Sequence, residues 1–344
     1  MLKQFTQGVR GLLRSADPFD ITPLAGDASN RSYHRVTQGN TSYILMRLSD
    51  PEGFKKSEEA VTGDVPVNEL PFLNMQRYLA RAGWPVPEVI ASSLDEGLIL
   101  LEDLGDVSLM AAIDGAAEEE VMARYWEAVD LLVSMQQDTL TDKDCVAFHR
   151  TYTEELLAWE FEHFVEYGIE ARLGAIPAAT RKALSGHFNN IAKQIAAQPT
   201  VLVHRDYHSR NIMVRQSGPE AGHLAVIDFQ DALMGPATYD LASLIWDPYV
   251  TLPEGVAEDI TARYWAQAPV KLGVDFPRVL NLTALQRLLK AAGRFVYIDK
   301  VKGNPAFLAD VPTCLARARW LLGGMDELAP LLDILAELDE AFAS

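Results

Sequence analysis

Residues 203–211 read VHRDYHSRN, and residues 227–231 read IDFQD. Each stretch continues a short apolar run, so we expect two strands that end at polar loops. The first loop is expected to expose Asp206 and bring Asn211 back beside it, and the second delivers Asp228 to the same place. Taken singly, each residue could be an ordinary turn residue, because Asp and Asn favour turns. Together, two carboxylates and an amide supply what phosphoryl transfer needs: a base for the nucleophile and hard oxygen ligands for Mg²⁺.

Composition narrows the class of protein. The chain has 344 residues, enough for one large domain or two lobes, and its apolar fraction of 49% is ordinary for a globular protein. Its 30 basic and 48 acidic residues give a net charge of −18, which argues against a nucleic-acid partner. Cys145 and Cys314 stand too far apart for a metal motif and are expected to be buried thiols. No apolar run is long enough for a membrane span or a signal peptide, so we expect a cytoplasmic protein.

Hydrophobic periodicity predicts an α+β fold in two parts. The first hundred residues indicate short strands around one helix: a hairpin from 33–36 and 42–48, a helix at 71–82 that stops at Gly83, and strands within 86–92 and 97–105. The remainder is mostly helical, with apolar residues three and four apart in 121–136, 151–169, 180–198 and 282–301. Two β-rich runs, 201–204 and 224–229, interrupt it and suggest one hairpin-like insertion. We therefore expect a small strand-rich lobe over residues 1–103 and a larger helical lobe over 104–344.

Two motifs together carry a family resemblance. HRDYHSRNIMV at 204–214 and LAVIDFQDALMGPATYDLASL at 224–244 resemble the aminoglycoside phosphotransferase and choline kinase branch of the protein-kinase-like superfamily, over roughly Leu24 to Lys302. The resemblance implies a two-lobed kinase fold in which Asp206 is the catalytic base and Asn211 and Asp228 bind Mg²⁺. It also implies that His204 and Asp240 brace the catalytic loop. From the residues alone, His204 indicates a hydrogen-bonded core histidine and Asp240 a helix N-cap.

The nucleotide side departs from the family pattern. By resemblance, the loop at 24–36, LAGDASNRSYHRV, covers the phosphates of ATP, with Gly26, Ser29 and Asn30 as small contacts. Arg31 or Arg35 could touch phosphate, although surface exposure is an equal alternative. Where the superfamily has a strand lysine this chain has Met46 or Arg47, and an arginine there can still clamp phosphate.

The resemblance extends to two further parts of the nucleotide side. By position, Glu69 would be the glutamate that partners the strand lysine. LILLEDLGD at 98–106 resembles the hinge between the lobes, so the backbone of Glu102, Asp103 and Leu104 is expected to pair with adenine.

The acceptor is narrowed by further resemblance. GDASNRSYHRV at 26–36, LLEDLGD at 100–106, LQRLLKAAGRF at 285–295 and DVPTCLARARWLL at 310–322 look like the branch of anomeric kinases acting on N-acetylmuramate and N-acetylglucosamine. This implies transfer of the γ-phosphate of ATP to the C1 hydroxyl, giving a sugar 1-phosphate for bacterial cell-wall recycling. The anomeric hydroxyl is acidic for an alcohol, which suits a carboxylate base. The choice between the two sugars and the oligomeric state are left open.

Basic residues are candidates for the lactyl carboxylate of N-acetylmuramate. Arg287, Lys290 and Arg294 recur three and four residues apart on one predicted helix, and Arg210 lies in the catalytic loop. The ordinary alternative for the helical three is a solvated face. Two rival functions stay open: an aminoglycoside kinase, which the charge of −18 suits, and a silent binding module, which the missing strand lysine suggests.

Overall fold

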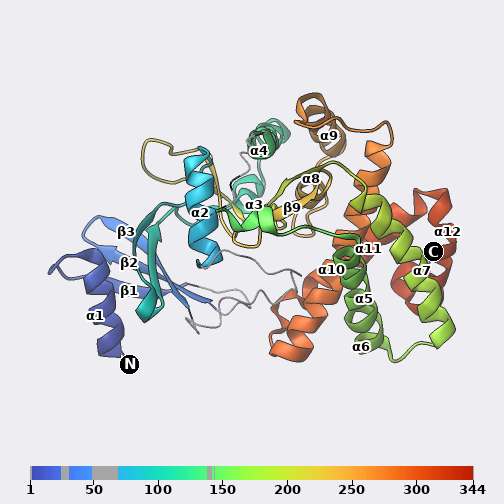
Figure 1. Cartoon of the computed structure of the whole chain (residues 1–344), viewed down its shortest axis with the longest axis horizontal. Helices are drawn as coiled ribbons and strands as arrows, with labels where there is room; N and C mark the ends of the chain where they lie inside the picture. The colour runs from blue at the N-terminus through green and yellow to red at the C-terminus, as the bar shows by residue number, and fades with distance from the viewer. Residues whose placement is uncertain (1, 25–30, 49–68, 138–141, 143, 344) are drawn as a thin grey trace.

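The computed structural model describes residues 2–24, 31–48, 69–137, 142 and 144–343, and no side chains before Thr6. A strand-rich region lies at one end of the molecule and a larger helical region at the other (Figure 1). The nine described strands are β1 (Asp20–Pro23), β2 (Arg31–Gln38), β3 (Thr41–Leu48), β4 (Val89–Ser93), β5 (Leu98–Glu102), β6 (Thr200–Val203), β7 (Ile212–Val214), β8 (Leu224–Val226) and β9 (Leu233–Pro236). The twelve described α-helices are α1 (Leu2–Leu13), α2 (Pro71–Arg81), α3 (Leu109–Ile113), α4 (Glu118–Gln137), α5 (Glu154–His163), α6 (Ala171–Leu173), α7 (Ala178–Ala196), α8 (Tyr239–Ile245), α9 (Val256–Gln267), α10 (Phe276–Lys302), α11 (Val311–Gly323) and α12 (Ala329–Leu338). The predicted α+β class is confirmed.

The N-terminal sheet is antiparallel, with strand order β1-β2-β3-β5-β4. β2 and β3 form the predicted hairpin around Gly39, whose φ of +60° suits a tight turn. Side chains alternate between the two faces of the sheet, and each face has its own cover. Met46, Leu48, Ile99 and Leu101 join the main core together with Phe72 and Met75 of α2. Leu45, Val36 and Leu98 point to the other face.

That second face is covered by α1, a helix the sequence pattern did not predict. Val9 and Leu12 of α1 form a small separate core with Val36, Leu45 and Leu98. The expectation of one helix in the first hundred residues is therefore wrong. Gly8 and Gly11 lower the helix propensity of this segment, and packing against the sheet overrides it.

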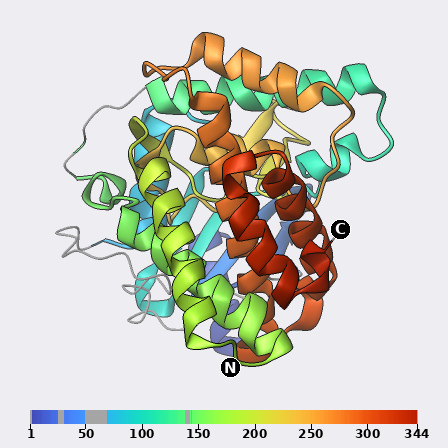
Figure 2. The same cartoon turned by 90° about the vertical axis from the view of Figure 1, so that its right-hand side faces the viewer.

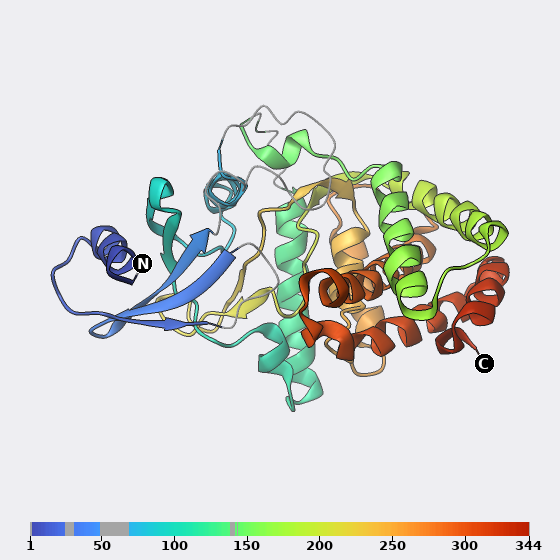
Figure 3. The same ribbon diagram turned by 90° about the horizontal axis from the view of Figure 1, so that it is seen from below.

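The helical region is organised around α10. This helix packs against α5, α7, α8 and α11, and α4 runs beside α9. Figure 2 shows α4 and α9 along one edge, and Figure 3 shows α4 between the N-terminal sheet and the helices near the C-terminus. α5 continues as a π-helix over Phe164–Glu170, so the helix predicted at 151–169 is confirmed with a change of pitch. Within the described part of the chain, no helix combines the length and apolar character that crossing a bilayer requires.

The strands inside the helical region pair differently from the prediction. β6 pairs with β9 and β7 pairs with β8, both antiparallel, so the runs at 201–204 and 224–229 belong to two separate two-stranded sheets. The expected single hairpin is wrong because β9 reads LMGP, which carries no strand signal of its own. The ends of β6 and β8 nevertheless meet, because the His204 ring after β6 is hydrogen-bonded to the Ile227 carbonyl after β8. The lobe boundary at residue 103 stays a prediction, since the main core is continuous across it.

Candidate active site

The loop that leaves β6 presents Asp206 from a strained turn. Arg205 has a φ of +79°, in the left-handed region that residues other than glycine rarely adopt. The Asp240 carboxylate accepts the His204 N–H at 2.6 Å and the Arg205 N–H at 3.0 Å. The Asp206 side chain that follows is 45% exposed, as expected for a residue that meets a substrate. One acidic side chain thus secures the backbone from which Asp206 projects.

Asp240 is fully buried in the first turn of α8, behind this loop. Burial raises its pKa to about 7, although both backbone donors favour the charged form. The N-cap interpretation is wrong, because Thr238 holds that position and the carboxylate bonds the catalytic loop instead. This geometry is the one that a bracing role requires.

His204 links the catalytic loop to the segment before Asp228. Its ring is buried, and Nε2 donates to the Ile227 carbonyl at 3.0 Å. Burial lowers the pKa of His204 to about 4, so the ring is neutral at physiological pH. It is a hydrogen-bonded core histidine, and it ties two loops of the site together.

Asn211 and Asp228 lie beside Asp206. Asn211 Nδ2 donates to the Asp206 carbonyl at 3.0 Å, and the Ile227 N–H donates to the Asn211 carbonyl at 3.0 Å. Asp228 has a φ of +65°, a second strained position. Burial raises the pKa of Asp228, and the negative charge of Asp206 adds to the effect. The structure therefore brings all three motif residues to one place.

The donor set fits a hard divalent cation held jointly with phosphate. The described residues contain no cluster of three or more His, Cys, Asp or Glu that would cage a metal alone. Asn211 and Asp228 offer an amide and a carboxylate, and Mg²⁺ is commonly held by one or two such ligands plus substrate phosphates. Gln230 Nε2 donates to Asp228 Oδ1 at 2.8 Å, which orients the carboxylate.

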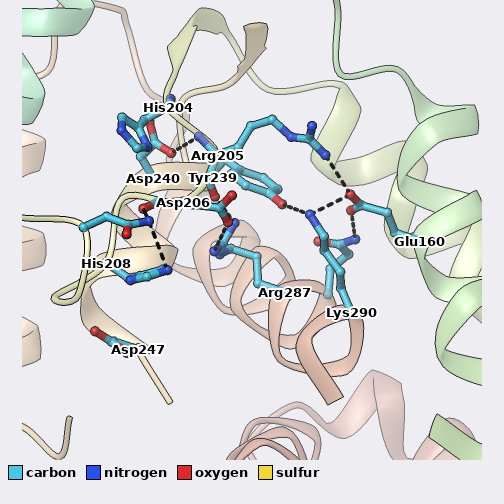
Figure 4. Close-up of polar contacts among 12 residues, drawn as sticks. Glu160, His204, Arg205, Asp206, His208, Tyr239, Asp240, Asp247, Arg287 and Lys290 are labelled. Atoms are coloured by element: carbon cyan, nitrogen blue, oxygen red, sulfur yellow. Dashed lines mark hydrogen bonds and ion pairs between the residues drawn. The ribbon is translucent and has the colours of Figure 1, made fainter. Parts of the chain in front are cut away.

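Two cations from α10 act on Asp206: Arg287 lies beside it, and Lys290 is paired with Glu160 (Figure 4). Arg287 Nη1 donates to the Arg205 carbonyl at 2.6 Å, and its Nη2 lies 4.0 Å from Asp206 Oδ1. The Lys290 and Arg287 side chains are only 15% and 14% exposed, so the solvated-face alternative is wrong for both. Burial alone raises the pKa of Asp206, but Lys290 and Arg287 outweigh it and hold that pKa below its ordinary value. Asp206 is thus kept ionised.

The other two predicted basic contacts lie apart from this pair. The Arg294 guanidinium stacks 5.0 Å from the Tyr297 ring centroid, in an aromatic group with Tyr167 and His163. Arg210 is exposed, and its guanidinium covers the Tyr249 ring at 3.5 Å. The structure therefore groups Arg287 and Lys290 with Asp206, and Arg294 with a different set of side chains.

Sequence reasoning missed the residue that anchors these cations, Glu160 of α5. Its buried carboxylate lies 2.8 Å from Lys290 Nζ and 3.3 Å from Arg205 Nη2 (Figure 4). It also accepts hydrogen bonds from Gln286 Nε2 at 2.7 Å and from the Tyr152 hydroxyl. One signal was available. Glu160 follows Leu156 by four residues on the apolar face of its helix, where an acid must find partners.

In β3, Met46 and Arg47, the two candidates for the position of the superfamily's strand lysine, point to opposite faces of the sheet. In β3, Met46 is fully buried on the face covered by α2. Arg47 is exposed and pairs with Leu98, whose side chain packs in the core under α1. Since neighbouring residues on a strand point to opposite faces, Met46 takes the lysine's place. Arg47 therefore lies on the face of the sheet that α1 covers, and its contact with the nucleotide stays a prediction.

Glu69 and Arg35 have other partners. Arg77 donates to Glu69 Oε1 and Oε2 at 2.5 and 2.7 Å, so Glu69, which lies just before α2, is paired with a residue of that helix. Arg35 forms ion pairs with both Asp103 and Asp106, and its Nε lies 2.6 Å from Asp103 Oδ2. Of the two arginines predicted to touch phosphate, Arg31 remains as a candidate. Gly26, Ser29 and Asn30 lie outside the described residues.

The predicted hinge lies where β5 ends and is fixed from the helical side. Glu102 pairs with Arg215, and the Gln216 N–H donates to the Leu104 carbonyl at 3.2 Å. The Asp103 side chain forms an ion pair with Arg35, so only the backbone of Asp103 could contact a nucleotide. The adenine contacts of Glu102, Asp103 and Leu104 stay predictions.

Comparison with solved structures places the fold. A choline kinase from Cryptosporidium parvum Iowa II superposes with a TM-score of 0.61 at 12% identity, covering 95% of this chain and 99% of that one. An ADP-bound aminoglycoside phosphotransferase, APH(2'')-Ib, gives a TM-score of 0.62 at 11% identity, covering 91% and 97%. The two-lobed protein-kinase-like fold is therefore confirmed.

Comparison by sequence places the family. Residues 20–272 match the phosphotransferase enzyme family. An N-acetylmuramate/N-acetylglucosamine kinase of Pseudomonas putida is 34% identical over 92% of this chain and 88% of that protein. A protein of the same name from Neisseria meningitidis serogroup B is 30% identical over 93% and 91%. The silent-module alternative is set aside, and the chain belongs to the phosphotransferase enzyme family as an ATP-dependent kinase.

Proposed function

We propose that this kinase transfers the γ-phosphate of ATP to the C1 hydroxyl of N-acetylmuramate and N-acetylglucosamine. The names of its relatives support an amino-sugar acceptor. The products would be sugar 1-phosphates that feed cell-wall recycling, in the cytoplasm where ATP is available. The division into a nucleotide lobe over residues 1–103 and a catalytic lobe over 104–344 is part of the same proposal.

The observation that carries the proposal is the pair of cations beside the base. Arg287 and Lys290 stand within the network around Asp206 and are largely shielded from solvent. N-acetylmuramate carries a lactyl carboxylate, which a cation recognises through a charge-assisted hydrogen bond. An aminoglycoside is a polycation, and the same two residues would repel it. The charge around the acceptor position therefore favours the sugar acid over the antibiotic, despite the net charge of −18.

Asp206 acts as the base in this scheme. Its partly exposed carboxylate accepts the proton of the C1 hydroxyl while the sugar oxygen attacks the γ-phosphorus and the bond from that phosphorus to the bridging oxygen breaks, which releases ADP. Asp240 and His204 keep the loop in position, and Arg287 secures the Arg205 carbonyl just before the base. Asn211 and Asp228 would hold Mg²⁺, which when bound neutralises charge on the phosphates.

Release of ADP from Mg²⁺ and ATP tests the acceptor class. The acceptors are N-acetylmuramate, N-acetylglucosamine, the 1-O-methyl glycoside of each, and kanamycin. Turnover with the free sugars and none with the methyl glycosides is the expected result. Turnover with kanamycin alone would move the enzyme to the antibiotic kinases. Turnover with the methyl glycosides would place the acceptor hydroxyl elsewhere on the ring.

A further inference from the structure

The face of the sheet that is covered by α2 is the face that looks toward Asp228. Phe72 of α2 stacks on Phe229, the residue after Asp228, with ring centroids 5.1 Å apart. Met46 lies on this face and is fully buried in the main core. A phosphate-binding lysine at position 46 would have reached the site from here. With methionine in its place, β3 brings no cation to this face near the phosphates.

The neighbouring strand offers a cation on the same face. Residues that lie directly opposite each other in an antiparallel pair share a face. The β2–β3 register pairs Tyr33 with Met46 and Arg31 with Leu48. Tyr33 and Leu48 both pack against the main core, which confirms their side of the sheet. Arg31 therefore lies on the Met46 face, at the first residue of β2 and within the segment predicted to cover the phosphates.

The charge environment of Arg31 agrees with this placement. Burial alone lowers the pKa of Arg31, but Tyr33, Asp228 and Asp231 outweigh it and raise that pKa. In the opposite direction, Arg31 partly offsets the rise that burial and Asp206 cause in the pKa of Asp228. The guanidinium thus lies within electrostatic reach of the residue proposed to hold magnesium.

We propose that Arg31 supplies from β2 the phosphate-binding cation that the superfamily carries on β3. Its forked guanidinium would hold two phosphate oxygens at once, whereas a lysine provides a single charged point. The same group balances Asp228 and Asp231 before a nucleotide arrives. Arg31 on β2 thereby takes the role of a lysine on the adjacent strand β3, and the fold stays the same.

Binding of adenosine and of MgADP, measured by calorimetry without any acceptor, separates a phosphate contact from a structural role. The variants are Arg31→Met and Arg31→Lys, with Arg319→Met as a control that removes an exposed arginine of α11. In Arg31→Met, MgADP affinity is expected to fall roughly 10- to 100-fold, the worth of a lost charge-assisted hydrogen bond. Adenosine affinity is expected to stay within about twofold. Arg31→Lys, which keeps the charge and loses the fork, should fall between Arg31→Met and the unaltered protein.

Two results would overturn the proposal. One is an equal loss of adenosine and MgADP affinity in Arg31→Met, which would show that the residue only maintains the fold. The other is a greater loss of MgADP affinity in Arg47→Met than in Arg31→Met, which would return the role to β3. Neither measurement uses a sugar, so the result stands apart from the C1 acceptor proposal.

Discussion

The catalytic-loop side and the nucleotide side of the active site position their side chains in different ways. On the catalytic-loop side, buried acids fix what surrounds the base: Asp240 holds the loop backbone, and Glu160 holds Lys290 and Arg205. On the nucleotide side, order comes from strand register, which sets Met46 into the core and turns Arg47 to the far face. A base needs its position and charge fixed from several directions, whereas phosphate can be met by a cation from either of two adjacent strands. The acceptor side is therefore expected to tolerate substitution less well than the nucleotide side.

The largest effect should come from Asp206→Asn. The substitution keeps the shape and removes the proton acceptor, so kcat is expected to fall about 10²- to 10⁴-fold. MgADP affinity should stay nearly unchanged, because the base acts on the acceptor. Steady-state ADP release and calorimetry give the two values. Near-normal turnover would mean that another group takes the proton.

Asp228→Ala should affect nucleotide binding, which Asp206→Asn is expected to leave nearly unchanged. Loss of a proposed magnesium ligand is expected to abolish the gain in ADP affinity that Mg²⁺ confers, a loss of about tenfold or more. Calorimetry of ADP with Mg²⁺ and with EDTA measures that gain. A Mg²⁺ effect of unaltered size in the variant would remove Asp228 from the metal site.

Glu160→Gln tests the buried anchor of the catalytic side. Lys290 and Arg205 would keep their charges without a counter-charge, and breaking a buried ion pair costs about 3–5 kcal/mol. Glu162→Gln on the same helix breaks a half-exposed pair with Arg181 and should cost about 1 kcal/mol or less. Urea unfolding of both variants makes the comparison. Equal losses would mean that the Glu160 network contributes little to the fold.

A smaller effect is expected from pH, through His204. Its pKa is about 4 in the folded protein and about 6.5 when unfolded, so between these values the unfolded chain binds more protons. The contribution of His204 to stability should fall as pH falls from about 6.5 to 4, by up to roughly 3 kcal/mol for a group this buried. Asp240 has the opposite slope across this whole range, because its folded pKa of about 7 lies above its unfolded value.

His204→Gln isolates the histidine from the other titrating groups. Glutamine can still donate to the Ile227 carbonyl and does not titrate. The difference between the urea unfolding free energies of the variant and the unaltered protein should therefore change across this pH range. A constant difference from pH 4 to 7 would contradict the assignment.

Local patterns predicted the parts of the fold whose signals lie within a few residues. The β2–β3 hairpin has a glycine turn between alternating apolar residues, and α2 ends before Gly83, whose φ is +83°. The Asp206, Asn211 and Asp228 set was visible because each residue follows or lies close to a short strand. By contrast, β9 owes its strand conformation to β6, far away in the sequence, and α1 owes its stability to the sheet beneath it.

The site residues that sequence reasoning missed depend on contacts with distant parts of the chain, or on which face of the sheet a strand residue points to. Glu160 acquires its importance only when α5 packs against α10 and the catalytic loop. The choice between Met46 and Arg47 is a shift of one residue, which on a strand exchanges the two faces of the sheet. Neither the packing partner nor the strand register is fixed by the residues on either side.

The phosphorus NMR spectrum of the product tests the central claim most directly. With N-acetylglucosamine as acceptor, the phosphorus is expected to couple to the single anomeric proton, which marks a 1-phosphate. Coupling to a methylene pair instead would mark a phosphate on C6 and contradict transfer to the anomeric hydroxyl.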